Sequence, residues 1–195
     1  MQPRTAAVVP ASPANPAVNY FEALELPEQL SLDRQDLEAR FYRLSRTLHP
    51  DRFARATPKE QQRALDASAV LNDAYRVLRD PVARAEYLLS LKGVAAADPK
   101  HVPPELLEEV FELNMALEEV KSGDTEALPQ LRQSHAHFQQ MLAATDRGLE
   151  SDFSAWDRAH APELLDGLRA RLNHRKYISN LLRETEKALE SHVSD

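Results

Sequence analysis

The sequence has no cysteine among its 195 residues. This absence excludes disulfide bonds, thiolate metal sites, cysteine-ligated iron–sulfur clusters and thiol catalysis. No segment approaches the roughly 18 consecutive apolar residues that a membrane-spanning helix needs, so we expect no membrane partner. Basic residues are outnumbered, and the net charge of −7 argues against a general nucleic-acid binder.

The composition that remains is typical of a soluble globular protein rather than a disordered one. Hydrophobic residues make up 43% and charged residues 28%, and the length fits one domain or two small ones. Residues 1–18 contain four prolines and a single Arg4. The apolar run there is too short for a signal peptide, and one arginine is too few for an organellar transit peptide. We therefore expect a disordered N-terminal tail and a cytoplasmic location.

Helix start signals recur along the chain, whereas few stretches alternate apolar and polar residues. Asn19 and Asp80 are placed as N-caps, a further helix is expected to start near Asp33, and Thr57 with Glu60 forms a capping box. The pattern predicts an all-α fold, with four helices before residue 93.

The C-terminal half is predicted to contain a second group of helices. Residues 94–103 are rich in alanine and proline and are interpreted as a linker. Three helices are expected to follow, at about 104–121, 124–147 and 162–191. A short helical turn over 153–159 is expected before the last one, with Phe153 and Trp156 in the core.

Glycines are expected to mark helix ends. Gly93, Gly123 and Gly148 each follow a helical segment, where a left-handed residue often ends the helix. Gly167 is the exception, since it lies inside a segment that is predicted to be helical.

The densest local signal is the tripeptide His49-Pro50-Asp51. Pro50 disfavours helical backbone at His49, which predicts an exposed loop that carries an imidazole and a carboxylate. Between Arg40 and Arg55 there are five basic residues and one acid. A local charge of +4 on an acidic protein indicates a docking surface for an acidic partner. By itself the tripeptide also fits an ordinary helix-stop loop, and a basic helix face is usually just solvated.

The motifs in combination resemble a known family. Asn19-Tyr20-Phe21, His49-Pro50-Asp51-Arg52-Phe53 and Arg84-Ala85-Glu86-Tyr87-Leu88-Leu89-Ser90 are similar to HscB co-chaperones, which belong to the J-proteins. The resemblance implies a J-domain over 19–93, a linker over 94–103 and a three-helix bundle over 104–195 that binds a client scaffold.

The resemblance also implies an activity without catalysis or cofactor. The partner would be an HscA-type, DnaK-like ATPase whose hydrolysis is stimulated on docking. His49, Pro50 and Asp51 would contact the ATPase, and the nearby arginines would steer it electrostatically, namely Arg40, Arg43, Arg46 and Arg52. The J-domain resemblance does not identify the client, so a co-chaperone for a different client protein stays an alternative.

The helix expected near 105–120 has two apolar stripes. Leu106, Val110, Leu113, Leu117 and Val120 form one, which suffices for packing against a core. Leu107, Phe111 and Met115 form a second line among glutamates, and residues 105–120 include no basic side chain. A helix with two apolar stripes needs a second partner.

The last helix gives a comparable pattern. Tyr177 lies about 180° from Leu168 on a helical wheel, with Leu181 beside it. This arrangement predicts an exposed hydrophobic surface. Leu107, Phe111 and Tyr177 could instead pack against the J-domain or a third helix of the bundle. The family resemblance implies that they bind an IscU-type iron–sulfur scaffold, through Leu107, Phe111, Glu112, Met115, Glu119 and Tyr177.

The sequence gives little support for metal binding or for acid–base catalysis. His135 and His137 are two residues apart on a helix, so their side chains diverge and cannot chelate one metal together. We expect no metal site. An acid–base pair of His49 and Asp51 would need a pocket that excludes water, and a loop tip offers none.

Overall fold

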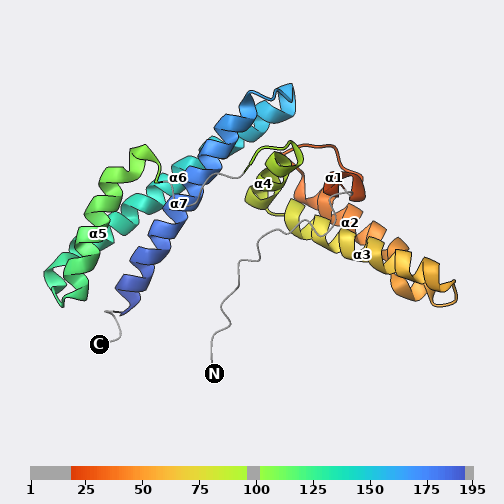
Figure 1. Cartoon of the computed structure of the whole chain (residues 1–195), viewed down its shortest axis with the longest axis horizontal. Helices are drawn as coiled ribbons and strands as arrows, with labels where there is room; N and C mark the ends of the chain where they lie inside the picture. Colours follow the sequence, from red (N-terminus) through yellow and green to blue (C-terminus); the bar gives the residue numbers. More distant parts are fainter. Residues whose placement is uncertain (1–18, 96–101, 192–195) are drawn as a thin grey trace. The chain divides into compact units, whose positions relative to one another are not determined.

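The computed structural model describes residues 19–95 and 102–191, and within these ranges it contains helices and no strand. This confirms the predicted all-α class. The chain divides into two compact units (Figure 1). The expected tail at 1–18 and most of the expected linker lie outside the described residues. None of the described helices is long and apolar enough to cross a membrane.

The first unit is built from the segments on either side of the His-Pro-Asp motif. It contains α1 (Tyr20–Ala23), α2 (Arg34–Leu48), the 3₁₀ helix η1 (Pro50–Phe53) and α3 (Pro58–Leu78). Figure 1 shows α2 and α3 as a long helical pair. Phe21, Leu37, Leu71 and Leu78 are buried in this unit.

The caps predicted at Asn19 and Thr57 are confirmed, and Asp33, near which a helix was expected to start, is a cap as well. Asn19 accepts a hydrogen bond from the backbone N–H of Phe21, and Asp33 accepts two at the start of α2. The Thr57 hydroxyl and the Glu60 carboxylate form the reciprocal capping box of α3. These bonds satisfy backbone donors that have no partner within the helix.

The turn after α1 contains an uncommon backbone conformation. The N–H of Leu26 donates to the carbonyl of Phe21, and the N–H of Glu25 donates to that of Glu22. This pair of bonds defines a Schellman motif, whose left-handed position usually holds glycine. Here the position is Glu25, with a φ of 55°.

The second unit contains the remaining helices and the segment 29–32. Its elements are α4 (Pro81–Leu91), η2 (Pro104–Leu106), α5 (Leu107–Lys121), η3 (Thr125–Ala127), α6 (Leu128–Ala159) and α7 (Leu164–Ser191). Asp80 caps α4 as predicted. Gly93 and Gly123 adopt positive φ after α4 and α5, which confirms two of the three expected helix-ending glycines.

Helices α5, α6 and α7 form a three-helix bundle (Figure 1). Its core is a cluster of side chains from all three helices, and the predicted first stripe of α5 belongs to it. Leu106, Leu113 and Val120 are buried there, and Val110 and Leu117 pack partly buried against them. Phe138 and Ile178 are the large contributions of α6 and α7.

The expected end of the second bundle helix at 147 is wrong. α6 continues through Gly148 to Ala159, where His160 closes it with a φ of 47°. Gly148 lies inside α6 and next to α7, where a Cβ would come 2.5 Å from the Arg171 guanidinium. Phe153 and Trp156 are buried as expected, but they belong to α6 rather than to a separate turn.

A partly buried polar cluster connects the segment 29–32 to the end of α6. The Asp157 carboxylate accepts hydrogen bonds from the backbone N–H groups of Leu30 at 2.6 Å and Ser31 at 2.7 Å. Arg84 of α4 is only 6% exposed. Burial lowers the pKa of its guanidinium, while the carboxylates of Asp157 and Asp80 act to raise it. α4 packs against α7 and belongs to the second unit. The expected domain boundary at residue 93 stays a prediction.

Candidate functional site

The His-Pro-Asp motif lies at the turn between α2 and α3. His49 ends α2 in an extended conformation, with φ −61° and ψ 127°, as expected for a residue before proline. Its Nδ1 accepts a hydrogen bond from the backbone N–H of Asp51 at 3.3 Å. The Asp51 carboxylate lies 3.4 Å from the same Nδ1.

The exposure of this pair fits docking better than catalysis. Both side chains are more than half exposed, so water has free access to them. An acid–base pair is effective where water is excluded and a substrate is enclosed. The loop presents rigid polar groups outward, as a recognition loop does.

Two of the predicted arginines surround the motif. A shallow hollow is lined by Ser45, Arg46, His49 and Arg52. Neither Arg46 nor Arg52 forms an ion pair with any residue that the structure describes. Their charges are therefore available to an acidic surface that approaches His49.

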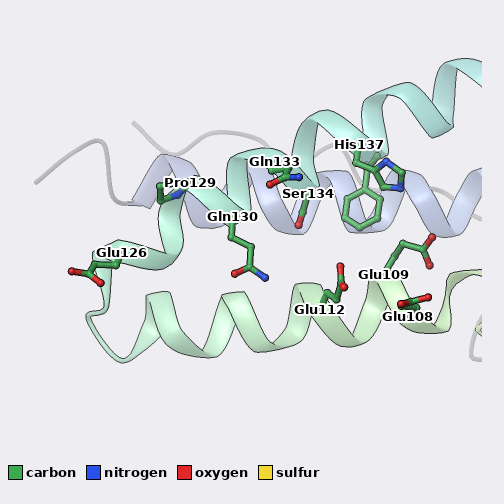
Figure 2. Close-up of a pocket in the computed structure, with 10 residues that line it drawn as sticks. Glu108, Glu109, Glu112, Glu126, Pro129, Gln130, Gln133, Ser134 and His137 are labelled. Carbon is green, nitrogen blue, oxygen red and sulfur yellow. The ribbon is translucent and has the colours of Figure 1, made fainter.

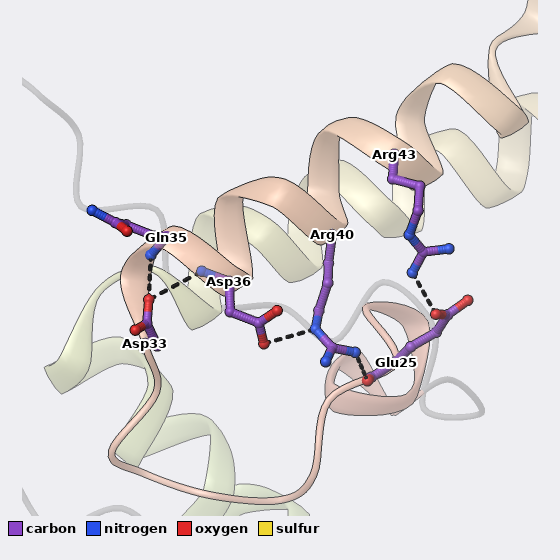
Figure 3. A network of polar contacts seen from close by, with 6 residues as sticks. All are labelled: Glu25, Asp33, Gln35, Asp36, Arg40 and Arg43. Carbon is purple, nitrogen blue, oxygen red and sulfur yellow. Dashed lines mark hydrogen bonds and ion pairs between the residues drawn. The ribbon is translucent and has the colours of Figure 1, made fainter.

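The other two predicted arginines are engaged within the unit (Figure 3). Arg40 pairs with Asp36 through Nε at 2.8 Å, and its Nη1 donates to the backbone carbonyl of Glu25. Arg43 Nη2 lies 2.5 Å from the Glu25 carboxylate. Sequence reasoning missed Glu25 because it lies 18 residues before Arg43 and outside the helix.

The second predicted surface lies on α5. Leu107, Phe111 and Met115 are 56%, 65% and 50% exposed, which confirms that the second apolar stripe is not covered by the bundle. Glu112 and Glu119 are exposed as well. An apolar row bordered by carboxylates has the composition of a protein-binding surface.

The expectation for the last helix is only partly correct. Leu181 is buried, and Tyr177 packs partly buried against the bundle core. α7 contacts both α5 and α6 as well as α4, so it buries side chains over a wide arc. Tyr177 therefore does not stand out from the surface in the way that Phe111 does.

An acidic groove runs between α5 and α6 (Figure 2). Glu108, Glu109 and Glu112 line it from α5, while Glu126 and His137 line it from the other side. One oxygen of Glu109 is buried without a hydrogen-bond partner. The groove extends the carboxylate border of the apolar row on α5.

The histidines of the bundle are used individually. His135 Nδ1 lies 2.9 Å from the Thr185 hydroxyl, which itself donates to the carbonyl of Leu182. His137 lines the acidic groove instead. Among the described residues no three potential ligands gather at one point.

Both halves of the chain match known protein families. A sequence model described as DnaJ domain matches residues 19–87, and one described as HSCB C-terminal oligomerisation domain matches residues 102–186. A co-chaperone protein HscB homolog of Vibrio vulnificus is 34% identical over 171 residues, which cover 87% of this chain and 95% of the relative. A homolog of the same name from Shewanella amazonensis is 35% identical over 134 residues, 65% of this chain and 75% of the relative.

Solved structures agree with this assignment. The chaperone HscB from Vibrio cholerae superimposes with a TM-score of 0.62 at 31% identity, covering 89% of this chain and 99% of that one. The human co-chaperone protein HscB has the same fold, with a TM-score of 0.66 at 23% identity over 88% of this chain and 82% of that one. These relatives imply that the J-domain works with an Hsp70-type chaperone. The chain belongs to the HscB family of J-domain co-chaperones.

Proposed function

We propose that this protein stimulates the ATPase of an HscA-type chaperone and delivers an IscU-type scaffold to it during iron–sulfur cluster maturation. It would do so in the cytoplasm, without catalysis or a cofactor of its own. The observation that carries the proposal is the pairing of two exposed surfaces on one chain. One is the His-Pro-Asp loop with Arg46 and Arg52, and the other is the apolar row of α5.

The loop is proposed to act by docking. His49, Pro50 and Asp51 contact the ATPase, while the four arginines steer an acidic partner toward the loop. Docking accelerates hydrolysis only to the extent that it favours the hydrolysing conformation of the chaperone. The effect is therefore a coupling free energy between two binding sites.

The bundle is proposed to hold the client. Leu107, Phe111 and Met115 supply apolar contact area, and Glu112 and Glu119 supply a rim that favours a basic partner. Tyr177 would contribute from the edge of this surface, since it is partly buried. We assign 19–93 to the J-domain, 94–103 to the linker and 104–195 to the client-binding bundle.

The chaperone half is tested by steady-state ATP hydrolysis. HscA-type chaperone is measured alone, with this protein, with IscU and with both together. We expect stimulation by this protein and a further synergistic rise with IscU. The variant His49→Gln should abolish both effects while thermal unfolding stays unchanged, because His49 is exposed. Failure of the wild-type protein to stimulate hydrolysis would reject the assignment.

The client half is tested by calorimetric titration of IscU into variants of the apolar row. Truncation of a central interface residue typically lowers affinity by about 2 kcal/mol, or roughly 30-fold. We expect Phe111→Ala to have an effect of this order and Leu107→Ala a somewhat smaller one, with basal ATPase stimulation unchanged. The matched control is Leu65→Ala, because Leu65 is a half-exposed leucine of α3. Unchanged affinity in both Phe111→Ala and Leu107→Ala would favour a different client protein.

A further inference from the structure

Glu25 occupies a backbone position that disfavours its side chain. It is the left-handed residue of the Schellman motif after α1, and its φ is 55°. Glycine adopts this conformation readily, whereas a residue with a Cβ is strained there. Helix termination alone would therefore favour glycine at this position.

The side chain of Glu25 is directed at the basic face of α2 (Figure 3). Its carboxylate pairs with Arg43 at 2.5 Å, and its carbonyl accepts a hydrogen bond from Arg40. The side chains of Arg43 and Glu25 are 56% and 52% exposed. Because an exposed ion pair contributes little to stability and exchanges readily with solvent, fold stability does not account for a glutamate at this point.

The pair does have an electrostatic consequence. Arg46 and Arg52 lack an ion-pair partner among the described residues, whereas the charge of Arg43 is opposed by the adjacent carboxylate. An acidic surface that approaches the His-Pro-Asp loop is attracted by the sum of these charges. It also has to replace Glu25 if it is to bind Arg43 directly.

We propose that Glu25 is an intramolecular competitor for Arg43 that lowers the rate at which the chaperone docks on the J-domain. This inference rests on the proposed function, since it concerns the same docking face. Glu25 acts through Arg43 and does not itself contact the chaperone. Glu25 therefore changes how fast the chaperone docks on the basic surface of α2 without being part of the binding surface.

The test measures association of the ATP-bound HscA-type chaperone with this protein by stopped-flow fluorescence, at about 50 mM and about 500 mM salt. We expect Glu25→Gln to raise the association rate constant about threefold at low salt, because one opposing charge is removed. At high salt the difference should disappear, since exposed charges are screened within a few ångströms. Glu25→Gly removes the carboxylate and suits the left-handed backbone, so it should show the same increase without loss of stability.

Two further variants distinguish competition for Arg43 from the effect of the changed net charge alone. Glu22→Gln makes the same charge change on α1 at an exposed carboxylate for which the structure gives no ion pair, and it should raise the rate clearly less. In an Arg43→Gln background, Glu25→Gln should give no increase beyond that of Glu22→Gln, because the competed group is gone.

The outcomes distinguish the two proposals. If the wild-type protein binds and His49→Gln abolishes stimulation, but Glu25→Gln leaves the association rate unchanged or lowers it, the competition is refuted and the function stands. An equal increase with Glu22→Gln likewise refutes it. If the wild-type protein neither binds nor stimulates the chaperone, the proposed function fails and this inference fails with it.

Discussion

Replacement of Asp157 by asparagine tests how the segment 29–32 is held. In the native protein each carboxylate oxygen accepts one backbone hydrogen bond, from Leu30 at 2.6 Å and Ser31 at 2.7 Å. An asparagine side chain keeps one acceptor oxygen and places an NH₂ donor where the second acceptor was. One of the two backbone N–H groups then faces the NH₂ donor, and the other donates to a neutral amide oxygen instead of a charged carboxylate.

The size of the effect follows from these contacts. A hydrogen bond to a charged group contributes roughly 1.5–3 kcal/mol, so the lost bond removes about 2 kcal/mol. The buried Arg84 also loses one of the carboxylates that favour its charged form, which adds about 1 kcal/mol. We expect Asp157→Asn to lower the free energy of unfolding by about 3 kcal/mol, which corresponds to a decrease in Tm of roughly 6–12 °C for a chain of this size.

Two measurements check this prediction. Thermal unfolding followed by circular dichroism gives the change in Tm, and hydrogen exchange at the Leu30 and Ser31 amides reports on the two bonds directly. The control is Asp152→Asn, which breaks the ion pair of the same helix with Arg171 at 2.5 Å. That pair is partly exposed, so its loss should stay within about 1 kcal/mol. Equal effects of the two variants, with unchanged exchange at residues 30 and 31, would refute the reasoning.

Two other predictions concern helix chemistry. The hydrogen bonds from the Thr57 side chain and backbone lower the pKa of Glu60 from its usual 4.5, so their contribution is complete above that pH and is lost as the pH falls through the lowered value. Denaturation curves should therefore show Glu60→Gln to be less stable than wild type at pH 7 and nearly equal to it at pH 2, whereas a constant difference would contradict the capping box. Gly167→Ala, with open space around its Cβ, should raise stability by about 0.5–1 kcal/mol. Gly148→Ala should raise the stability clearly less, because its Cβ displaces the Arg171 side chain. Equal increases for the two variants would show that the contact with Arg171 does not matter.

Local chemistry made the first unit predictable. Asn19, Asp33 and Thr57 cap helices through atoms two or three residues away, so a sequence of a few residues contains the whole signal. The exposed loop at His49 follows from the proline after it. The uncovered stripe of α5 was also predictable, because a regular helix places Leu107 and Phe111 away from Leu113.

Long-range contacts were not predictable in this way. Gly148 was expected to end a helix, but α6 continues through it, and the neighbour at this position is Arg171, 23 residues further along the chain. The helical wheel of α7 assumed one packing face, whereas Leu181 is buried because α7 has neighbours on several sides. Asp157 and Glu25 gave no signal, since their partners lie 127 and 18 residues away and no periodicity connects them.

The continuity of α6 has a structural consequence. At about 1.5 Å per residue its 32 residues span roughly 48 Å, from the end that packs against α5 to the carboxylate that holds Leu30 and Ser31. Gly148 lies inside this helix against Arg171 of α7, whose guanidinium pairs with Asp152 one turn further along α6. On the proposed function, α6 is therefore one continuous element that joins the client-binding face of α5 to the segment 29–32.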